Sequence, residues 1–186
     1  NIQPVSEIVE KFMTRVIGID PGSRRTGFGV IDVHRTRLTY VASGVIHLKE
    51  KIFSDRLKII FDDLSEILDQ YKPEQMSVEE VFFARDPRAA LKLGQARGVA
   101  LLAGVKFGID IGEYSAKSIK LSVVGSGAAD KRQVQLMVTT LLDLSSPPPE
   151  DAADALAAAI CHAHSMTTNL TLKGSLKNSY ARGRNN

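Results

Sequence analysis

The chain has few cysteine and aromatic residues. It has no tryptophan and a single cysteine, Cys161, among 186 residues. One cysteine excludes an internal disulfide and a metal site built from several thiolates. Because Cys161 lies in an alanine-rich helical pattern, we expect it to be a small core residue. Aromatic residues make up 6% of the chain and hydrophobic residues 44%, so the core must be aliphatic.

Long apolar runs and targeting segments are also lacking. No stretch reaches the roughly 18 apolar residues that a membrane helix needs, and no signal-peptide pattern is present. We therefore expect a protein of the cytosol, where thiols stay reduced. The length and the 24% of charged residues are typical of one globular domain.

Acidic residues are missing from the last part of the sequence. The chain has a net charge of +3, and residues 166–186 contain Lys173, Lys177, Arg182 and Arg184 but no Asp or Glu. This pattern predicts either a flexible basic tail that touches a polyanion or a tail that only improves solubility. The sequence leaves both readings open.

The hydrophobic pattern changes its period along the chain. Periods of two or continuous apolar runs predict strands, and a period near 3.6 predicts helices. The expected strands are 16–20, 26–33, 38–48, 76–79 and 109–114. The expected helices are 57–71, 87–106, two around the glycine turn 125–127, and 150–164. Three strands in a meander followed by βαβ crossovers predict an α/β fold with a mixed sheet and helices on its faces. We expect an N-terminal extension over 1–14, a domain over 15–165 and the basic tail over 166–186.

Four acids stand where such a fold places functional groups. Asp20 and Glu79 each end a predicted strand, and ligands of α/β sheets bind at the carboxyl ends of strands. Asp151 and Asp154 are spaced i, i+3 at the start of the last helix, so they share one face of it.

The two helix acids have a simpler explanation as well. Acids in a first helical turn favour the helix dipole and cap free amides, which accounts well for Asp151. Asp154 lies among alanines and needs a partner, and no Arg or Lys falls three or four residues away from it. Four ionised carboxylates at short range need counter-charge, and Mg²⁺ prefers such oxygen ligands. Two magnesium ions at one site stabilise phosphoryl transfer.

Several stretches resemble the RuvC family of bacterial Holliday-junction resolvases. The resemblance runs in order from residue 15 to 164. It is carried by residues 18–27 (GIDPGSRRTG), 78–83 (VEEVFF), 91–98 (LKLGQARG), 123–125 (VVG) and 151–157 (DAADALA).

The resemblance implies a ribonuclease-H-like fold and a homodimer that makes paired, symmetric nicks across a four-way DNA junction in recombination and repair. It implies a catalytic, metal-binding set of Asp20, Glu79, Asp151 and Asp154, although some relatives have His at the position of Asp151. It implies two Mg²⁺ ions per active site, with Mn²⁺ as a plausible substitute, and hydrolysis that leaves a 5′-phosphate and a 3′-hydroxyl. It also implies cooperation with the RuvA/RuvB branch-migration complex in the bacterial cytoplasm, at the nucleoid.

The resemblance also implies DNA contacts. Lys120 and Lys131 match the family's lysines near the scissile strand, and Phe82 matches its aromatic wedge against a junction base. From the pattern alone, either lysine could equally lie on a solvated helix face, and which of Phe82 and Phe83 is exposed stays open. Arg97 is expected to help hold DNA together with the lysines and the tail.

The predicted helix over 87–106 is apolar or small on more than one face. One face would cover the sheet, and the other could cover a second copy of the chain, which a two-fold enzyme requires. A central helix in a monomer is the simpler reading. Other readings of the whole chain are an RNA-processing nuclease of the related YqgF family, a fragment of an actin-like ATPase, and a junction-binding module without catalysis.

Overall fold

A computed structural model describes residues 13–80 and 86–182, with residues 169–182 described by their backbone only. Five strands form one sheet in the order β3-β2-β1-β4-β5. The strands are β1 (Met13–Asp20), β2 (Arg25–His34), β3 (Arg37–His47), β4 (Gln75–Glu79) and β5 (Asp110–Tyr114). The helices are α2 (Phe53–Tyr71), α3 (Pro87–Lys106), α4 (Ala116–Val124), α5 (Lys131–Leu141) and α6 (Glu150–Arg182).

The sheet is mixed, as the sequence predicts. β1, β2 and β3 form an antiparallel meander, in which Asp20 pairs with Gly27. β4 lies parallel to β1 on its other side, and β5 lies parallel to β4. Because β1 and β4 are parallel neighbours, their carboxyl ends meet at the same edge of the sheet. The fold is ribonuclease-H-like, and the predicted order of strands and helices is confirmed.

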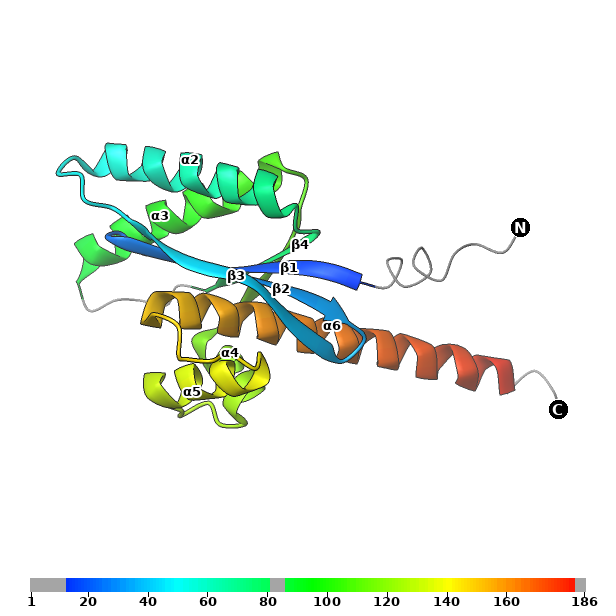
Figure 1. Cartoon of the computed structure of the whole chain (residues 1–186). Helices are drawn as coiled ribbons and strands as arrows, with labels where there is room; N and C mark the ends of the chain where they lie inside the picture. Colours follow the sequence, from blue (N-terminus) through cyan, green and yellow to red (C-terminus); the bar gives the residue numbers. More distant parts are fainter. Residues whose placement is uncertain (1–12, 81–85, 183–186) are drawn as a thin grey trace.

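Helices cover both faces of the sheet (Figure 1). α2 and α3 pack on one face, over a core that includes Ile17, Ile19 and Met76. α4, α5 and α6 pack on the other face, over a core that includes Val16 and Ile31. Both cores are aliphatic, and Cys161 is buried in the second one, as expected.

The first turns of α6 lie directly against the backbone of β1 and β2. A methyl group added at Gly18 would overlap the carbonyl oxygen of Ala155, and one added at Gly27 would overlap that of Asp151. Only glycine lets a helix approach a strand this closely. On the neighbouring strand, the buried hydroxyl of Ser77 donates a 2.8 Å hydrogen bond to the carbonyl oxygen of Ala158. These contacts fix α6 across the middle of the sheet.

Three predicted boundaries are wrong. The first strand begins at Met13, three residues before the expected start, and α2 begins at Phe53, four residues before the first apolar residue of the expected helix. The last helix does not end near His164 but continues to Arg182, so most of the segment expected as a flexible tail has a helical backbone. The small and polar residues after His164 carry little amphipathic signal, which is why the pattern lost the helix there. Residues 1–12 of the expected extension lie outside the described residues.

No helix within the described ranges is both long and apolar enough to cross a bilayer.

Replacing Gly18 by alanine should lower the free energy of unfolding by about 2–3 kcal/mol, because the added methyl group meets helix backbone that cannot move aside. Urea unfolding measures the loss. Gly44→Ala is the matched control: its methyl group would meet only the ring of Phe28, a partly exposed side chain that can turn, so its loss should be clearly smaller. Equal losses in the two variants would contradict this account of the glycine contact.

Candidate active site

Asp20 and Glu79 end two neighbouring parallel strands. Asp20 is the last residue of β1 and Glu79 the last residue of β4. The ladder between the strands pairs Ile19 with Val78, so each acid lies one residue beyond the last pair. The two carboxylates therefore stand at one edge of the sheet, as the sequence predicts.

Asp154 completes the group from the other side. It projects from the first turns of α6, and with Asp20 and Glu79 it lines a pocket of about 270 Å³. The remaining lining residues are Ala116, Ile119, Lys120, Lys131 and Val134. Asp151 is not among the lining residues, but its charge acts on Asp20, so it stands at the rim. The structure thus brings together acids from three distant stretches of sequence.

The acids oppose one another's ionisation. Burial and the charges of Asp154, Glu79 and Asp151 raise the pKa of Asp20 from 3.8 to about 7. Burial is also the largest cause of the raised pKa values of Glu79 and Asp154. A cluster of carboxyl groups that resists ionisation marks a place where further positive charge would bind favourably.

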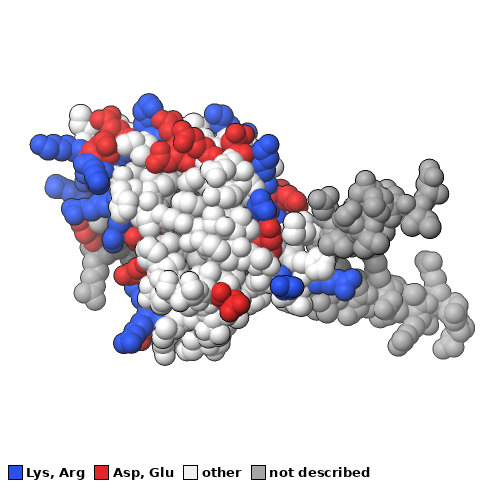
Figure 2. All heavy atoms as spheres, viewed as in Figure 1, with Lys and Arg blue, Asp and Glu red and all other residues white. Residues whose placement is uncertain are grey.

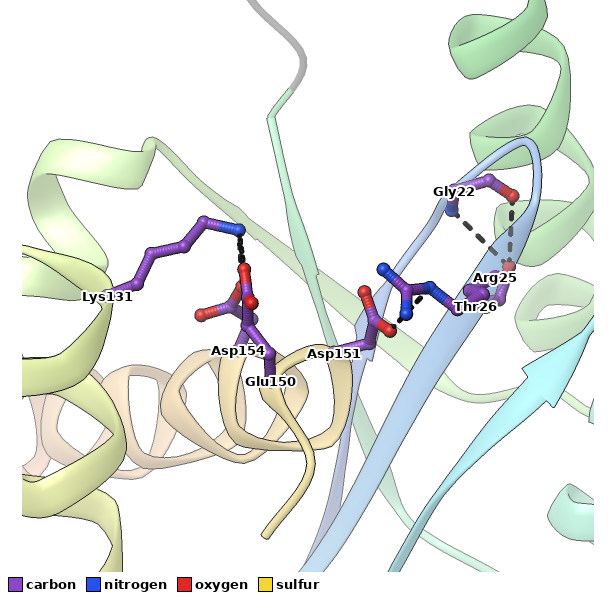
Figure 3. Close-up of polar contacts among 7 residues, drawn as sticks. All are labelled: Gly22, Arg25, Thr26, Lys131, Glu150, Asp151 and Asp154. Atoms are coloured by element: carbon purple, nitrogen blue, oxygen red, sulfur yellow. Dashed lines mark hydrogen bonds and ion pairs between the residues drawn. The ribbon is translucent and has the colours of Figure 1, made fainter. Parts of the chain in front are cut away.

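Two basic side chains supply part of that charge (Figure 3). Arg25, the first residue of β2, points toward Asp151 and forms an ion pair of 3.0 Å between Nε and Oδ2. Lys131, the first residue of α5, has its Nζ 3.7 Å from Oδ2 of Asp154 and also pairs with Glu150. Each helix acid is therefore turned toward a cation on another element, so Asp154 has the basic partner that its own helix does not offer.

The residues fit a hard divalent cation in donor chemistry. All four candidate ligands are carboxylates, the oxygen donors that Mg²⁺ and Mn²⁺ accept. Among the described residues, no three His, Cys, Asp or Glu side chains are grouped closely enough to hold one ion. Arg25 and Lys131 already pair with Asp151 and Asp154, so a bound cation would compete with these ion pairs for the two carboxylates.

The residues expected to contact DNA lie in different surroundings. Lys120 and Lys131 both line the pocket. The positive charge of each offsets part of the rise in the pKa of Glu79. Arg97 is largely covered, at 17% exposure, and is bound to protein groups. Phe82 and Phe83 lie outside the described residues. DNA binding by any of these side chains stays a prediction.

Known proteins that are similar to this chain identify its family. The family model for crossover junction endodeoxyribonuclease RuvC matches residues 16–162, a range that contains all four acids. The chain belongs to the RuvC family. A RuvC protein of Teredinibacter turnerae is 50% identical over 177 residues, which cover 92% of this chain and 99% of that relative. One of Tolumonas auensis is 51% identical over 172 residues, with the same coverage of both proteins.

A solved RuvC structure is similar as well. The structure of Thermus thermophilus RuvC in complex with a Holliday junction substrate superposes with a TM-score of 0.79 at 33% identity. The likeness covers 84% of this chain and 96% of that one. The resemblance to the RuvC family inferred from the motifs is thereby confirmed.

Arg25 and Glu150 are site residues of this RuvC-family chain that the sequence reasoning missed. Both are exposed charged residues beside a candidate ligand, and neither has a spacing that singles it out. A signal for Arg25 was available, because two residues after it comes Gly27, which pairs with Asp20 across the meander. A strand that returns beside Asp20 necessarily places its first side chains near the site.

The raised pKa of Asp20 gives a testable dependence of stability on pH. The folded chain keeps a proton on Asp20 up to a pH of about 7, whereas the unfolded chain releases it near 3.8. Folding stability must therefore fall as the pH rises between these values. Asp20→Asn removes this loss, so in EDTA its advantage over the unaltered chain should grow by on the order of 2 kcal/mol from pH 4.5 to pH 7.5.

Urea unfolding at the two pH values measures the difference. Asp62→Asn, which alters an acid on α2 outside the pocket, is the control and should show no such growth. If the difference in stability between Asp20→Asn and the unaltered chain stayed constant, the pKa of Asp20 would not be raised in the folded chain.

Proposed function

We propose that the chain is a structure-specific DNA endonuclease that resolves four-way junctions by paired, symmetric nicks, in recombination and repair. The observation that carries the proposal is the pocket in which Asp20, Glu79 and Asp154 converge, with Asp151 at its rim, in a chain of the RuvC family. The Thermus thermophilus RuvC that was solved in complex with a Holliday junction substrate has the same fold over nearly its whole length, which supports the same class of substrate here.

The proposed cofactor is Mg²⁺, two ions per active site, with Mn²⁺ as a substitute to be tested. Asp20, Glu79, Asp151 and Asp154 would hold the ions. When bound, two such ions would supply Lewis acidity and stabilise the attacking and leaving oxygens of an in-line displacement at phosphorus. The raised pKa values of three of these acids support the assignment, because bound cations would offset the burial and the mutual repulsion that raise them.

The chain's own side chains would bind and orient the substrate. Lys120 and Lys131 point their charges into the pocket region, where an ammonium group can bind a phosphate oxygen and stabilise negative charge that develops during attack. Lys131 and Arg25, which pair with Asp154 and Asp151, would become available to phosphates once cations bind those acids. Hydrolysis of the P–O3′ bond by water leaves a 5′-phosphate and a 3′-hydroxyl, which a ligase can join.

The surface charge suits a DNA substrate. In Figure 2, Lys and Arg side chains gather at the end of the molecule where α2 and α3 begin, while Asp and Glu follow α2. β1 ends at the same side (Figure 1), so Asp20 lies toward the basic end. The exposed basic residues around these helix starts are Lys49, Lys51, Lys58, Arg88 and Lys92. Binding through phosphates would weaken steeply as the salt concentration rises.

A homodimer is proposed from the outer face of α3. Leu91, Leu102 and Val105 are 69%, 58% and 64% exposed, and Gly94 and Gly98 lie between them at helical spacing. A methyl group added at either glycine would meet nothing within 4 Å. Two glycines that weaken a helix without relieving a contact inside the chain fit a close approach by a second helix. A two-fold dimer through α3 would present two pockets to one junction.

The proposal includes three features that rest on membership of the RuvC family. These are wedging of a junction base by Phe82, DNA contact by the basic segment 166–186, and cooperation with a RuvA/RuvB complex in the bacterial cytoplasm at the nucleoid. A junction-binding module without catalysis is disfavoured because all four acids are present. Processing of structured RNA, the activity of the related YqgF family, is the second candidate, and substrate choice separates the two.

A nicking assay on a synthetic mobile four-way junction tests the function. The chain should make paired nicks with Mg²⁺ or Mn²⁺ and none with EDTA, because the carboxylates need cations to act on a phosphate. Asp20→Asn should lower the nicking rate at least about 10³-fold while junction binding persists. Asp62→Asn, an acid outside the pocket, should nick normally. Nicking by Asp20→Asn, or cleavage of structured RNA in preference to the junction, would count against the proposal.

The double variant Leu91→Glu with Leu102→Glu tests the dimer. Two charges on the proposed contact would face their copies across the two-fold axis, so we expect a monomer in sedimentation and light scattering. Paired nicks should become single nicks. The matched control is the double variant Leu121→Glu with Leu136→Glu, on α4 and α5, whose side chains are similarly exposed, at 55% and 51%. Loss of the dimer in the control but not in the α3 variant would assign the interface to the other face.

A further inference from the structure

Arg97, on α3, makes two polar contacts beside the pocket. Its Nε donates a 3.0 Å hydrogen bond to the backbone carbonyl oxygen of Glu79. Its Nη2 forms an ion pair with the carboxylate of Glu113 on β5. The side chain is 17% exposed, against 46% for that of Glu113. Arg97 therefore joins α3, β4 and β5 at the point where β4 ends.

The contact acts at the end of the ladder between β1 and β4. The last pair of this ladder is Ile19 with Val78, and the residue that follows β1 is Pro21, which has no N–H to donate to the carbonyl oxygen of Glu79. On the other side, Glu79 pairs with Tyr114, and the amide of Glu80 donates to the carbonyl oxygen of Tyr114 at 2.8 Å. Beyond Glu80 the chain leaves the sheet. Arg97 thus supplies a hydrogen bond to the carbonyl oxygen of Glu79 where the ladder with β1 ends.

We propose that Arg97 is a positioning residue for Glu79, and that Glu113 orients Arg97. By holding the carbonyl group of Glu79, the guanidinium sets the direction in which the Glu79 carboxylate enters the pocket, toward Asp20 and Asp154. The inference rests on the proposed function, since it concerns the same four-acid site. It replaces a direct role of Arg97 in holding DNA, because both of its contacts are to protein groups.

The chemistry of the side chain explains why arginine is needed. The planar guanidinium presents donors in a fixed fork, so one side chain can bind a carbonyl oxygen and a carboxylate together. A lysine has one nitrogen on a flexible stem and cannot hold both groups in that geometry. Groups that orient metal ligands affect metal affinity by about 10–100-fold when they are removed. A shift of the Glu79 backbone should therefore appear first in metal binding.

The variants Arg97→Lys and Arg97→Gln test the proposal in the full chain. Mn²⁺ binding without DNA, followed by calorimetry, should weaken by about 10–100-fold in both variants. The Mg²⁺ concentration for half-maximal nicking should rise in parallel, and nicking should recover at high Mg²⁺. Junction binding in EDTA should change by less than about twofold. Glu113→Gln, at a more exposed site, should weaken Mn²⁺ binding in the same direction by several-fold. Lys106→Gln, which removes an exposed charge at the other end of α3, should not.

The outcomes separate the alternatives. Unchanged Mn²⁺ affinity with weaker junction binding in EDTA would overturn the proposal and make Arg97 a DNA contact. Unchanged Mn²⁺ affinity with a lower unfolding free energy would overturn it too, and would make the contact a staple between α3 and β5. If the unaltered chain bound Mn²⁺ but nicked no junction, while Arg97→Gln still lost Mn²⁺ affinity, the proposed function would fail and the positioning role would stand.

Discussion

The close contact between α6 and the backbone of β1 and β2 is the constraint on which the site depends. Because Gly18 and Gly27 have no side chains, the backbone of α6 packs directly on the backbone of the two strands. A hydrogen bond from Ser77 joins β4 to the same helix. Because the helix packs directly on the strand backbone, its first turns stand above the ends of β1 and β4. Asp154 faces Asp20 and Glu79 for this reason, and a larger residue at either glycine would separate acids that lie more than 130 positions apart in sequence.

That rigid scaffold holds together groups that repel one another. Burial and mutual charge raise the pKa of Asp20 to about 7, while Arg25 and Lys131 each draw one acid of α6 aside. The backbone thus fixes where the carboxylates start, and the side chains keep freedom in where they point. Such a division suits a site whose occupant is a small cation, since the ion pairs can exchange without any movement of the sheet or helix. Glu79 differs in one respect, because the side chain of Arg97 also holds its backbone carbonyl group.

Much of this arrangement could be predicted from the sequence, for definite physical reasons. Asp20 and Glu79 follow apolar strands, and parallel neighbours must bring such residues to one edge, so their pairing follows from topology. The i, i+3 spacing of Asp151 and Asp154 placed them on one face but did not show what they faced. The ion pairs of Arg25 and Lys131 could not be predicted, since they join side chains of elements whose packing no local pattern reports. The continuation of α6 to Arg182 was missed because its residues after His164 lack an apolar period, and Phe82 lies where the structure describes nothing.

The docking of α6 also has a consequence for the order of events during protein synthesis. Asp20 and Glu79 leave the ribosome early, on a meander and crossover that can already form a sheet. Their partner Asp154 is translated only after α5, and the groove over Gly18 and Gly27 stays without its helix until then. A nascent chain that ends before residue 150 therefore holds two of the four acids and none of the contacts that close the pocket. The site can therefore be completed only after α6 is made, so an interrupted translation product carries no complete set of ligands.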